Sequence, residues 1–471
     1  MSDKTDFKII IAGGGIAGLT LANMLEKFDI DYVLLESHNE ITPQVGASIG
    51  LLPNGLRILD QIGVYERIRK FLMSKSNFHI NDSNGQSVFL LPNFLKRLES
   101  RHGYPLLFFD RQWLLQALYA NLQDKSKILT GKKVTHVDLV DGGVKATTMA
   151  GDQFCGTLIV GADGVNSTVR SEMFRLGHQL QPGYFGMDEE QHMVCHYICC
   201  FGIAQDVPGW VDGDICRTLG DRVSQLVASG VNGRVYFFFF SKLPESKYGK
   251  EIPRFTKEMK EEFVKKNANY PITQKVTFGQ LYEHQITSTL TPLHEYVLKK
   301  WFFNRMIVFG DSAHKPNPIG GQGGNAAIES CAEFLNSLLS IKARRSGTLN
   351  NLSDDEIFNM FHEVQTARQE RAAMVVKASH DEQSLVAFES PLKSTVTFKF
   401  LLPFLRHETA LSKLGKPLSG ARKVERLPDA GRPRTIPFVD ELPENSWTWS
   451  TSAQLSLLTL GVGFIIGKYV R

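Results

Sequence analysis

A glycine-rich turn near the N-terminus constrains the fold of this chain more than any other feature. Gly13, Gly15 and Gly18 follow an apolar run from Phe7 to Ala12 and precede leucines at helical spacing. This order of strand, tight turn and helix is typical of a βαβ unit whose helix N-terminus faces a dinucleotide pyrophosphate. We therefore expect Gly13 to form the turn, Gly15 to admit the phosphates, and Gly18 to let the helix pack on the sheet.

A carboxylate at the end of the next strand supports this interpretation. Glu36 follows a second apolar run, Tyr32 to Leu35. At that place it can accept hydrogen bonds from the ribose hydroxyls of an adenosine. The context argues against a chance glycine-rich turn, but such a start serves NAD as well as FAD, so the identity of the cofactor depends on the rest of the chain.

Composition excludes several classes of protein. The chain has 471 residues, of which 42% are hydrophobic and 22% charged, so it is long enough for two domains with substantial cores. The net charge of +4 is small and the basic residues are spread out, which gives no case for nucleic-acid binding. The six cysteines lack zinc-ligand spacing, so we expect buried free thiols and no metal site. The short polar start from Met1 to Asp6 argues against a secretory leader.

The C-terminal end is different in character. No charged residue occurs from Asn445 to Gly467, and Leu455 to Ile466 is strongly apolar. Tryptophans precede this run and basic residues follow it, as at the edges of a membrane helix. The pattern predicts a membrane helix over 447–470, and we expect the endoplasmic reticulum membrane with the catalytic domain on the cytosolic side. A helix packed on the protein or lying in the membrane interface is the alternative.

Strand-like runs dominate the middle of the chain and predict a second sheet. They are Val194–Phe201, Ser224–Val227, Arg234–Phe240 and Lys275–Phe278. The third run shows no alternation of polar and apolar residues, so both of its faces should be covered. Asn84-Gly85 predicts the turn of a hairpin, and the proline- and charge-rich stretch from Lys416 to Asn445 is interpreted as a linker.

Two further motifs complete the pattern. Gly161-Ala162-Asp163-Gly164 ends one predicted strand, and Gly310-Asp311 ends another before a glycine-rich loop that opens a helix at Gly323-Gly324-Asn325. With the first turn, these motifs resemble the single-component flavin-dependent aromatic hydroxylases and epoxidases over residues 7 to about 380. The apolar tail makes the chain similar to fungal members that epoxidise prenyl chains in meroterpenoid and indole-diterpene pathways.

The resemblance implies bound FAD and assigns residues to it. Asp311 can accept hydrogen bonds from the ribityl hydroxyls, and the backbone of Gly323, Gly324 and Asn325 can approach the flavin ring. The positive end of the following helix would stabilise the anion formed on reduction.

Other assignments rest on the resemblance alone. It implies that Arg111 contacts FAD, that Gly50 lies along it, and that Asp163 with Arg170 bridges the flavin and nicotinamide regions. A surface cation in a turn is the alternative for Arg170. His314 is expected to support its loop and not to act as an acid or base.

The expected fold class is α/β. A Rossmann-like FAD-binding domain of the GR2 type carries an inserted mixed β-sheet substrate domain and C-terminal helices. The expected bounds are 1–75, 105–180 and 290–380 for the FAD-binding domain, 76–104 and 181–289 for the substrate-binding domain, 381–445 for a helical segment and linker, and 447–470 for the membrane helix.

In the family that the sequence resembles, NADPH reduces FAD and O2 adds to the reduced ring as a C4a-hydroperoxide. That species delivers one oxygen to an electron-rich carbon, and the cofactor supplies the chemistry. The leading hypothesis is epoxidation of a prenyl, farnesyl-type, double bond in a lipophilic terpenoid intermediate. The alternatives are hydroxylation of an aromatic ring, an FAD-dependent reductase of prenyl double bonds, and a non-catalytic FAD-binding membrane protein.

Side chains on the second sheet are the candidates for orienting the substrate. Tyr197 and Tyr236, named as candidate catalytic residues, and His196 lie on its predicted strands, and ordinary core positions are the alternative for all three. Ile198 stands where some relatives carry an arginine, which argues against a phenolate-binding mechanism and remains compatible with a hydrophobic substrate.

Overall fold

The computed structural model describes residues 6–43, 48–187 and 189–443. Among these residues no helix is both long enough and apolar enough to cross a bilayer. The membrane helix predicted at 447–470 lies outside the described residues.

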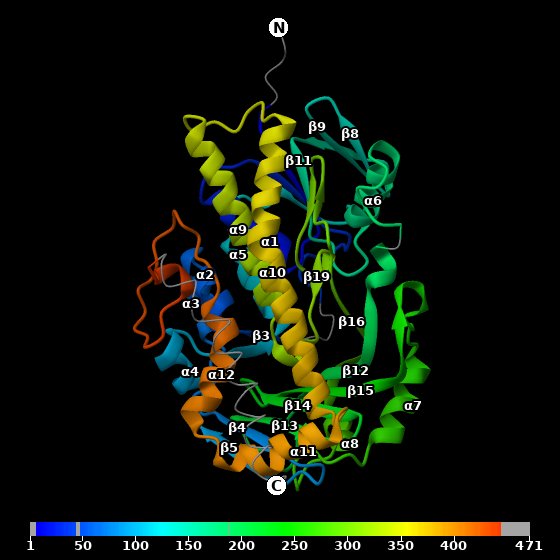
Figure 1. Ribbon diagram of the computed structural model, residues 1–471, viewed down its shortest axis with the longest axis vertical. Coiled ribbons are helices and arrows are strands. Elements are labelled where there is room, and N and C mark those ends of the chain that lie inside the picture. Colours follow the sequence, from blue (N-terminus) through cyan, green and yellow to red (C-terminus); the bar gives the residue numbers. More distant parts are fainter. Residues whose placement is uncertain (1–5, 44–47, 188, 444–471) are drawn as a thin grey trace, which may run out of the picture.

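A six-stranded sheet forms the core of the first layer (Figure 1). Its strand order is β17-β18-β11-β1-β2-β7, and all pairs are parallel except β17 with β18. The bounds are β1 (Ile9–Ala12), β2 (Tyr32–Leu35), β7 (Ile128–Leu129), β11 (Leu158–Gly161), β17 (Phe302–Phe303) and β18 (Met306–Val308). Every residue of β1, β2 and β11 is buried, as a parallel sheet covered on both faces requires.

Long helices cover this sheet. They are α1 (Ile16–Glu26), α5 (Arg111–Asn121), α9 (Gly323–Arg344) and α10 (Asp354–Val386). α9 packs against both α1 and α10, and α10 continues from the first layer down to the second sheet (Figure 1). The helix predicted to open at Gly323 is therefore present as α9, and it packs between α1 and α10.

The predicted second sheet is present and has eight strands, which lie below the first layer in Figure 1. It is mixed, because β13 and β4 pair in parallel while the other pairs are antiparallel. The order is β19-β16-β12-β15-β14-β13-β4-β5, with bounds β4 (Asn77–Asn81), β5 (Ser87–Pro92), β12 (Val194–Gln205), β13 (Asp214–Leu219), β14 (Val223–Ser229), β15 (Arg234–Tyr248), β16 (Gln285–Val297) and β19 (His314–Lys315). The fold is therefore α/β with an inserted mixed sheet.

Two sequence predictions about this sheet need correction. The run Lys275–Phe278 is not a strand, because Thr277 caps α8 (Phe278–Glu283) in a capping box with Gln280. The expected domain boundary between 289 and 290 falls inside β16, so the sheet extends beyond it.

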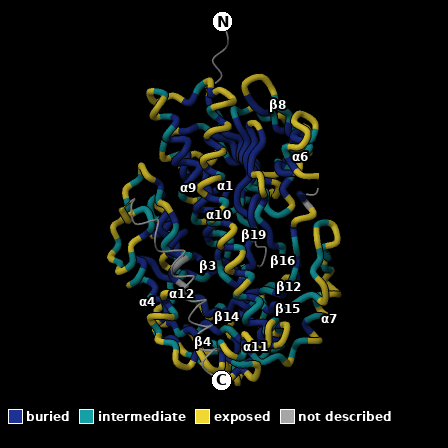
Figure 2. The backbone as a smooth tube through the Cα atoms, in the orientation of Figure 1, coloured by how far each residue is buried: buried dark blue, intermediate teal, exposed yellow. Residues whose placement is uncertain are grey.

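The phenylalanine-rich strand β15 is covered on both faces, as its lack of alternation predicts. Phe237 and Phe239 pack with Phe278 in one apolar cluster. Phe240 belongs to a different cluster on the other face of the sheet, and Phe238 packs against that second cluster. Figure 2 shows the buried interior at both levels of the molecule.

Smaller elements complete the fold. A hairpin of β8 (Val134–Val140) and β9 (Gly143–Thr148) pairs with β10 (Gln153–Gly156), and β3 (Ser48–Leu51) pairs with β6 (Leu107–Asp110). The remaining α-helices are α2 (Pro53–Gln61), α3 (Tyr65–Arg69), α4 (Phe94–His102), α6 (Thr168–Leu180), α7 (Lys257–Asn267), α11 (Pro391–Thr395) and α12 (His407–Ser419).

The stretch interpreted as a linker is bound to the body of the protein up to residue 443. Arg57 on α2 is buried and donates to Asp429 at 2.8 Å and to Asp440 at 2.7 Å. Its guanidinium also lies 4.2 Å from the centre of the Phe438 ring. The interpretation as a free linker is therefore wrong, because an arginine far away in the sequence holds this stretch against α2.

We predict that Arg57→Met lowers the free energy of unfolding by about 3 kcal/mol, since it leaves the carboxylates of Asp429 and Asp440 without their cation. Urea unfolding followed by circular dichroism measures this loss. Arg67→Met is the matched control: Arg67 is exposed, and its substitution should change stability by less than about 0.5 kcal/mol. Equal unfolding midpoints for the two variants would contradict the prediction.

Candidate active site

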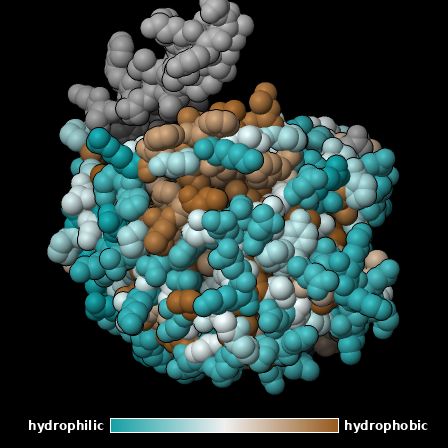
Figure 3. Space-filling view, turned by 90° about the horizontal axis from the view of Figure 1, so that it is seen from below, coloured by the Kyte–Doolittle hydropathy of each residue, from teal (hydrophilic) through white to brown (hydrophobic). Residues whose placement is uncertain are grey.

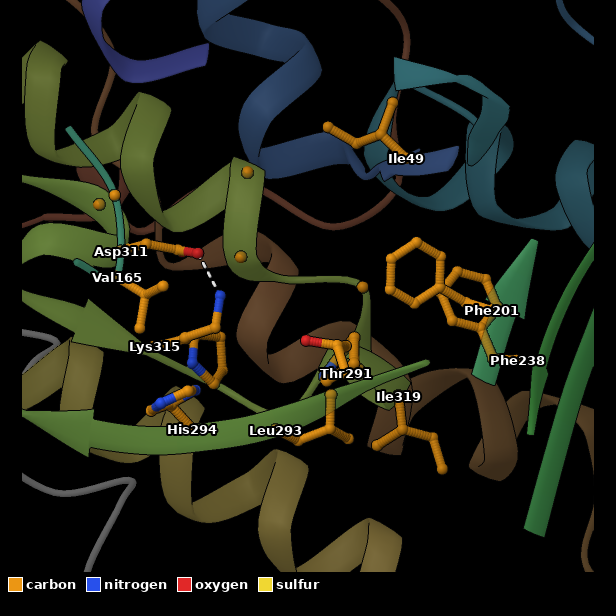
Figure 4. Close-up of a pocket in the computed structure, with 18 of the residues that line it drawn as sticks. Ile49, Val165, Phe201, Phe238, Thr291, Leu293, His294, Asp311, Lys315 and Ile319 are labelled. Atoms are coloured by element: carbon orange, nitrogen blue, oxygen red, sulfur yellow. Dashed lines mark hydrogen bonds and ion pairs between the residues drawn. The ribbon is translucent and has the colours of Figure 1, made fainter. Parts of the chain in front are cut away.

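One large cavity of about 1130 Å³ lies between the two sheets. Its upper wall consists of the first glycine turn, β3 and the N-terminus of α9. Side chains of the second sheet form other walls: Phe201 and Phe238 lie at the right of the view in Figure 4, and Thr291 and Leu293 lie at the bottom. The predicted dinucleotide site and the predicted substrate sheet thus face a common space.

The glycine turn has the geometry of a close helix–strand junction. Gly13 has a φ of +106°, and a Cβ atom there would collide with the carbonyl oxygen of Ala162. A Cβ atom on Gly18 would collide with the carbonyl oxygen of Gly13. Gly15 lines the cavity itself. Only glycine fits at the first and third positions, because the backbone approaches too closely for any side chain.

Glu36 lies beside this turn at the end of β2. Its carboxylate accepts hydrogen bonds from the backbone N–H of Gly14 at 2.6 Å and of His38 at 2.8 Å. Burial raises the pKa of Glu36, but the hydrogen bonds to its carboxylate lower the pKa by more than burial raises it. The net pKa of Glu36 is therefore below its usual value. An ionised acceptor therefore stands where the adenosine ribose is expected.

Arg111 at the start of α5 is a half-buried cation in the cavity wall. A Cβ atom on Gly15 would lie 3.6 Å from its Nη2 atom. Within the described part of the chain, its guanidinium has no hydrogen-bond partner, and burial lowers its pKa against the opposing effect of Asp311 and Glu36. A cavity-lining guanidinium without a bonded partner suits an anion such as a pyrophosphate.

Asp311 follows β18 and faces the cavity, where it forms an ion pair with Lys315 (Figure 4). Burial raises the pKa of this carboxyl, but Lys315 lowers it more, so the group is ionised and can accept hydrogen bonds from ribityl hydroxyls. Gly310 before it has a φ of +56°, which turns the chain at the strand end. Lys315 was missed by the sequence reasoning, although its spacing of four residues from Asp311 was a signal.

The N-terminus of α9 packs against β3 at the edge of the cavity, and we call the part of the cavity beside these two elements the slot. Gly323 and Gly324 line the cavity, together with Gly50. A Cβ atom on Gly324 would lie 2.8 Å from Ile49, and nothing lies within 4 Å of such an atom on Gly323. A flat ring can therefore approach the free N–H groups of the first helical turn.

The side chain of Asn325 joins the start of α9 to β3. It is fully buried, and its side chain donates to the carbonyl oxygens of Gly50 at 3.0 Å and of Gly321 at 2.7 Å. It also accepts from the backbone N–H of Leu52 at 3.0 Å. Asn325 thus binds β3 to α9 and fixes the width of the slot, and it does not line the cavity.

The predicted bridge by Asp163 and Arg170 is also different. The Asp163 carboxylate accepts from the N–H of Thr168 at 2.7 Å and from that of Val169 at 3.1 Å, so it holds the start of α6 and lies outside the cavity lining. Arg170 does line the cavity, and it donates to the carbonyl oxygen of Val165 at 2.7 Å. It is buried, so the surface-cation alternative is wrong.

The two candidate catalytic tyrosines do not reach the cavity. Tyr236 is fully buried and donates its hydroxyl to Asp110 at 2.8 Å. Tyr197 is fully buried and donates to Glu389. His196 hydrogen-bonds Ser246 at 2.7 Å and also lies outside the lining. The expectation that these side chains orient a substrate is corrected: their polar atoms join elements of the fold.

The cavity contains an ion pair that the sequence reasoning missed. Arg217 on β13 and Glu382 on α10 both line it and bond to each other. Ile198, where an arginine was considered, packs in the apolar cluster on the far face of the sheet. No local pattern marked this pair, since the strand of Arg217 also carries the polar residues Asp214 and Thr218.

Two remaining predictions concern histidines and metals. His314 is buried, lies 3.2 Å from the Ser330 hydroxyl, and has a pKa lowered to about 4 by burial, so it is neutral and supports its loop. Against the expectation of no metal ligands, the described residues include one group, His196, Glu295 and His380, whose ligand atoms lie within 4.8 Å of one another. This group lies outside the cavity lining.

Comparison with known proteins agrees with this geometry. Residues 6–342 match the model of the FAD binding domain family. The chain is 36% identical to FAD-dependent monooxygenase atmM of Aspergillus flavus over 405 residues, 86% of this chain and 84% of that protein. It is 40% identical to FAD-dependent monooxygenase olcE of Penicillium canescens over 71% of this chain and 72% of that protein.

Solved structures share the fold. Klebsiella pneumoniae HpxO complexed with FAD and uric acid matches with a TM-score of 0.69 at 19% identity, over 89% of this chain and 98% of that chain. The 2,6-dihydroxypyridine-3-hydroxylase from Arthrobacter nicotinovorans matches with a TM-score of 0.62 at 16% identity, over 82% of this chain and 94% of that chain. At these identities the likeness concerns the fold alone.

We predict that Asp311→Ala weakens FAD binding by about 10- to 100-fold, because a charged hydrogen-bond acceptor contributes about 1.5–3 kcal/mol. Glu36→Ala should weaken binding less specifically, since its carboxylate also accepts hydrogen bonds from the backbone of the turn itself. Titration of FAD into each apoprotein measures the affinities. Asp141→Ala, in the exposed β8–β9 turn, is the control and should bind like the wild type. Unchanged affinity in the Asp311 variant would refute the assignment.

For Tyr236→Phe we expect a loss of about 1–3 kcal/mol in unfolding free energy, because the buried Asp110 carboxylate loses its donor. FAD affinity should stay within twofold of the wild type. Denaturant unfolding and FAD titration on the same preparation test both statements. A changed FAD affinity with unchanged stability would show that Tyr236 acts on the cavity after all.

Proposed function

The chain belongs to the family of FAD-dependent monooxygenases, and from that premise we propose that it epoxidises a prenyl, farnesyl-type, double bond of a lipophilic fungal terpenoid intermediate with NADPH and O2. The observation that carries the proposal is the chemical division of the cavity. Polar and charged groups surround the slot beside α9, while the opposite wall is formed mainly by aromatic and aliphatic side chains. A flat cofactor and an apolar chain can lie face to face there.

The apolar wall supports a hydrocarbon substrate. Phe201 and Phe238 project into the cavity from the second sheet, and Leu293 and Ile319 face them (Figure 4). Burying a prenyl chain against these side chains gains about 25 cal/mol for each Å² of apolar surface. The same wall excludes water, which protects a reactive oxidant in the slot.

The Arg217–Glu382 pair supports a substrate with a polar end. This pair is charged, whereas its neighbours in the cavity wall are apolar: Ile215 lies on the same strand as Arg217, and Leu226 lies on the adjacent strand β14. A hydroxyl or carbonyl group on the ring portion of the substrate can hydrogen-bond to this pair. The pair would then fix which double bond of the chain lies over the slot.

The protein groups around the slot position and stabilise charge. When bound, FAD would supply the redox chemistry that links the nicotinamide cofactor, O2 and the alkene. The first turn of α9 directs its N–H groups at the slot, where they would stabilise a negative charge by up to about 2 kcal/mol. Arg111 would hold the phosphates and Asp311 the ribityl chain, and the apolar wall would hold the alkene without acid or base catalysis.

Product analysis under ¹⁸O₂ tests the proposed reaction. A farnesylated aromatic acceptor is incubated with FAD-loaded protein and NADPH, and mass spectrometry locates the label. We expect one labelled oxygen in an epoxide of the prenyl chain. Label in a ring hydroxyl would establish the aromatic hydroxylase instead, and an unlabelled, saturated product formed without oxygen would establish the reductase.

A variant of the ion pair tests the polar anchor. We predict that Arg217→Met raises KM for such a substrate by about tenfold, the effect of losing one charged hydrogen bond of about 1.5 kcal/mol. The FAD affinity should be unchanged, because Arg217 lies on the second sheet away from the slot. Steady-state kinetics with FAD-saturated enzyme measures KM, and an unchanged KM would exclude the anchor.

For the C-terminal segment we propose a membrane anchor in the endoplasmic reticulum with the catalytic domain on the cytosolic side. The absence of charge from 445 to 467 and the basic residues that follow support it. Alkaline carbonate extraction of expressing cells tests this: an anchored chain stays with the membranes.

A further inference from the structure

An exposed apolar stripe runs along the surface at the lower end of the molecule. Leu392, Val396, Phe400 and Phe404 recur every four residues along a continuous helical segment. Their exposed fractions are 79%, 40%, 63% and 85%, and the neighbouring Leu401 is 56% exposed. Figure 3 shows apolar side chains gathered on this face. We call these five residues the apolar stripe.

The opposite side of the same segment is apolar as well. Phe398 and Leu402 are buried and join the cluster that contains the cavity-lining residues Phe78, Phe94 and Ile319. The segment therefore has one apolar side packed on the protein and a second apolar side, the stripe, that the described chain leaves uncovered. An exposed apolar surface of this kind marks a place of contact with another apolar medium.

The charge around the stripe indicates which medium. Between Glu389 and Glu408 the chain carries Lys393, Lys399 and Arg406 and no acidic residue. All three basic residues are exposed. Apolar side chains flanked by cations are the pattern of a surface that lies in the headgroup region of an anionic membrane, since each cation near such a surface contributes about 1 kcal/mol.

The stripe lies beside the edge of the large sheet. β5, the edge strand, contacts the short helix at 402–404, and the Phe89 ring lies 5.9 Å from the ring of His407. Val88 and Leu90 are also exposed, but they alternate with Phe89 along β5 and so lie on the other face of that strand. The exposed apolar surface of this proposal is therefore the stripe alone.

We propose that this stripe is a membrane-contacting face that lies in the interfacial region of an anionic bilayer. The uncharged apolar run at 455–466 of the same chain, outside the described residues, supplies a second contact with the same bilayer. Only the purpose of this membrane contact rests on the proposed lipophilic substrate. The cavity wall and the segment that carries the stripe belong to one packed apolar cluster. A substrate dissolved in the bilayer would therefore cross only a short distance through water to reach the cavity.

A fluorophore at the stripe tests the proposal in the full-length, FAD-loaded protein. Cys155, the exposed native cysteine, is replaced by serine so that it is not labelled. The other native cysteines are buried, so the label reacts with the introduced cysteine. Phe404→Cys then carries an environment-sensitive NBD label. The control is Met149→Cys, which is 74% exposed in the β9–β10 turn at the other end of the molecule.

On phosphatidylcholine–phosphatidylserine vesicles we expect the label at position 404 to shift to the blue and to be quenched severalfold more by spin-labelled lipid than the label at 149. The Lys393→Glu, Lys399→Glu double variant should reduce this quenching. Equal quenching at 404 and 149 would overturn the proposal. A label at 404 that is already shifted without vesicles would also overturn it, because a protein segment or a second copy would then cover the stripe.

The outcome is independent of the reaction. The fluorescence needs no turnover, so an enzyme that proved to hydroxylate a ring could still contact the membrane through this face. Conversely, an epoxidase whose position 404 remained in water would retain the proposed function and lose the proposed surface.

Discussion

A buried polar network around Glu329 determines where the N-terminus of α9 lies, and the cavity depends on that position. Glu329 accepts hydrogen bonds from Arg368 at 2.5 Å and from Arg371 at 2.6 Å, both on α10, and from Asn54 on α2 at 2.7 Å. Burial raises its pKa, but the two arginines lower it to about 2, so the carboxylate is ionised. Fully bonded networks of this kind specify one arrangement of helices, because a shifted helix would leave a buried charge unpaired.

The same helix begins with residues that act on the cavity. One turn before Glu329, Asn325 binds the strand β3 and sets the distance across the slot. Two residues earlier, Gly323 leaves that slot open. Stability and function are thus encoded in successive turns of α9: the polar network fixes the helix, and the fixed helix presents its free N–H groups to the space between the sheets.

Local motifs could be predicted from the sequence because their chemistry is contained in a few consecutive residues. The turn at Gly13 and the strand end at Asp311 are of this kind: a close backbone contact requires Gly13, and a positive φ favours glycine at position 310. The tyrosines could not be placed, because a phenol on a strand faces either the cavity or another element, and only the distant partner decides. Asp110 for Tyr236 and Glu389 for Tyr197 come from remote parts of the chain.

The electrostatic balance of the cavity follows from contacts that no local pattern contains. Arg111, Arg170 and Lys315 come from three separate segments and line one end of the cavity together with a single carboxylate, Asp311. Lys315 pairs with Asp311, and Arg170 donates to backbone carbonyl oxygens, which leaves the Arg111 guanidinium without a bonded anion among the described residues. An unpaired cation in a cavity wall attracts an anion more strongly than one that already has a carboxylate partner. Arg111 is therefore the group in this wall with the greatest capacity to pair with an anionic part of a ligand, and a ligand that binds only the folded protein should also stabilise the fold.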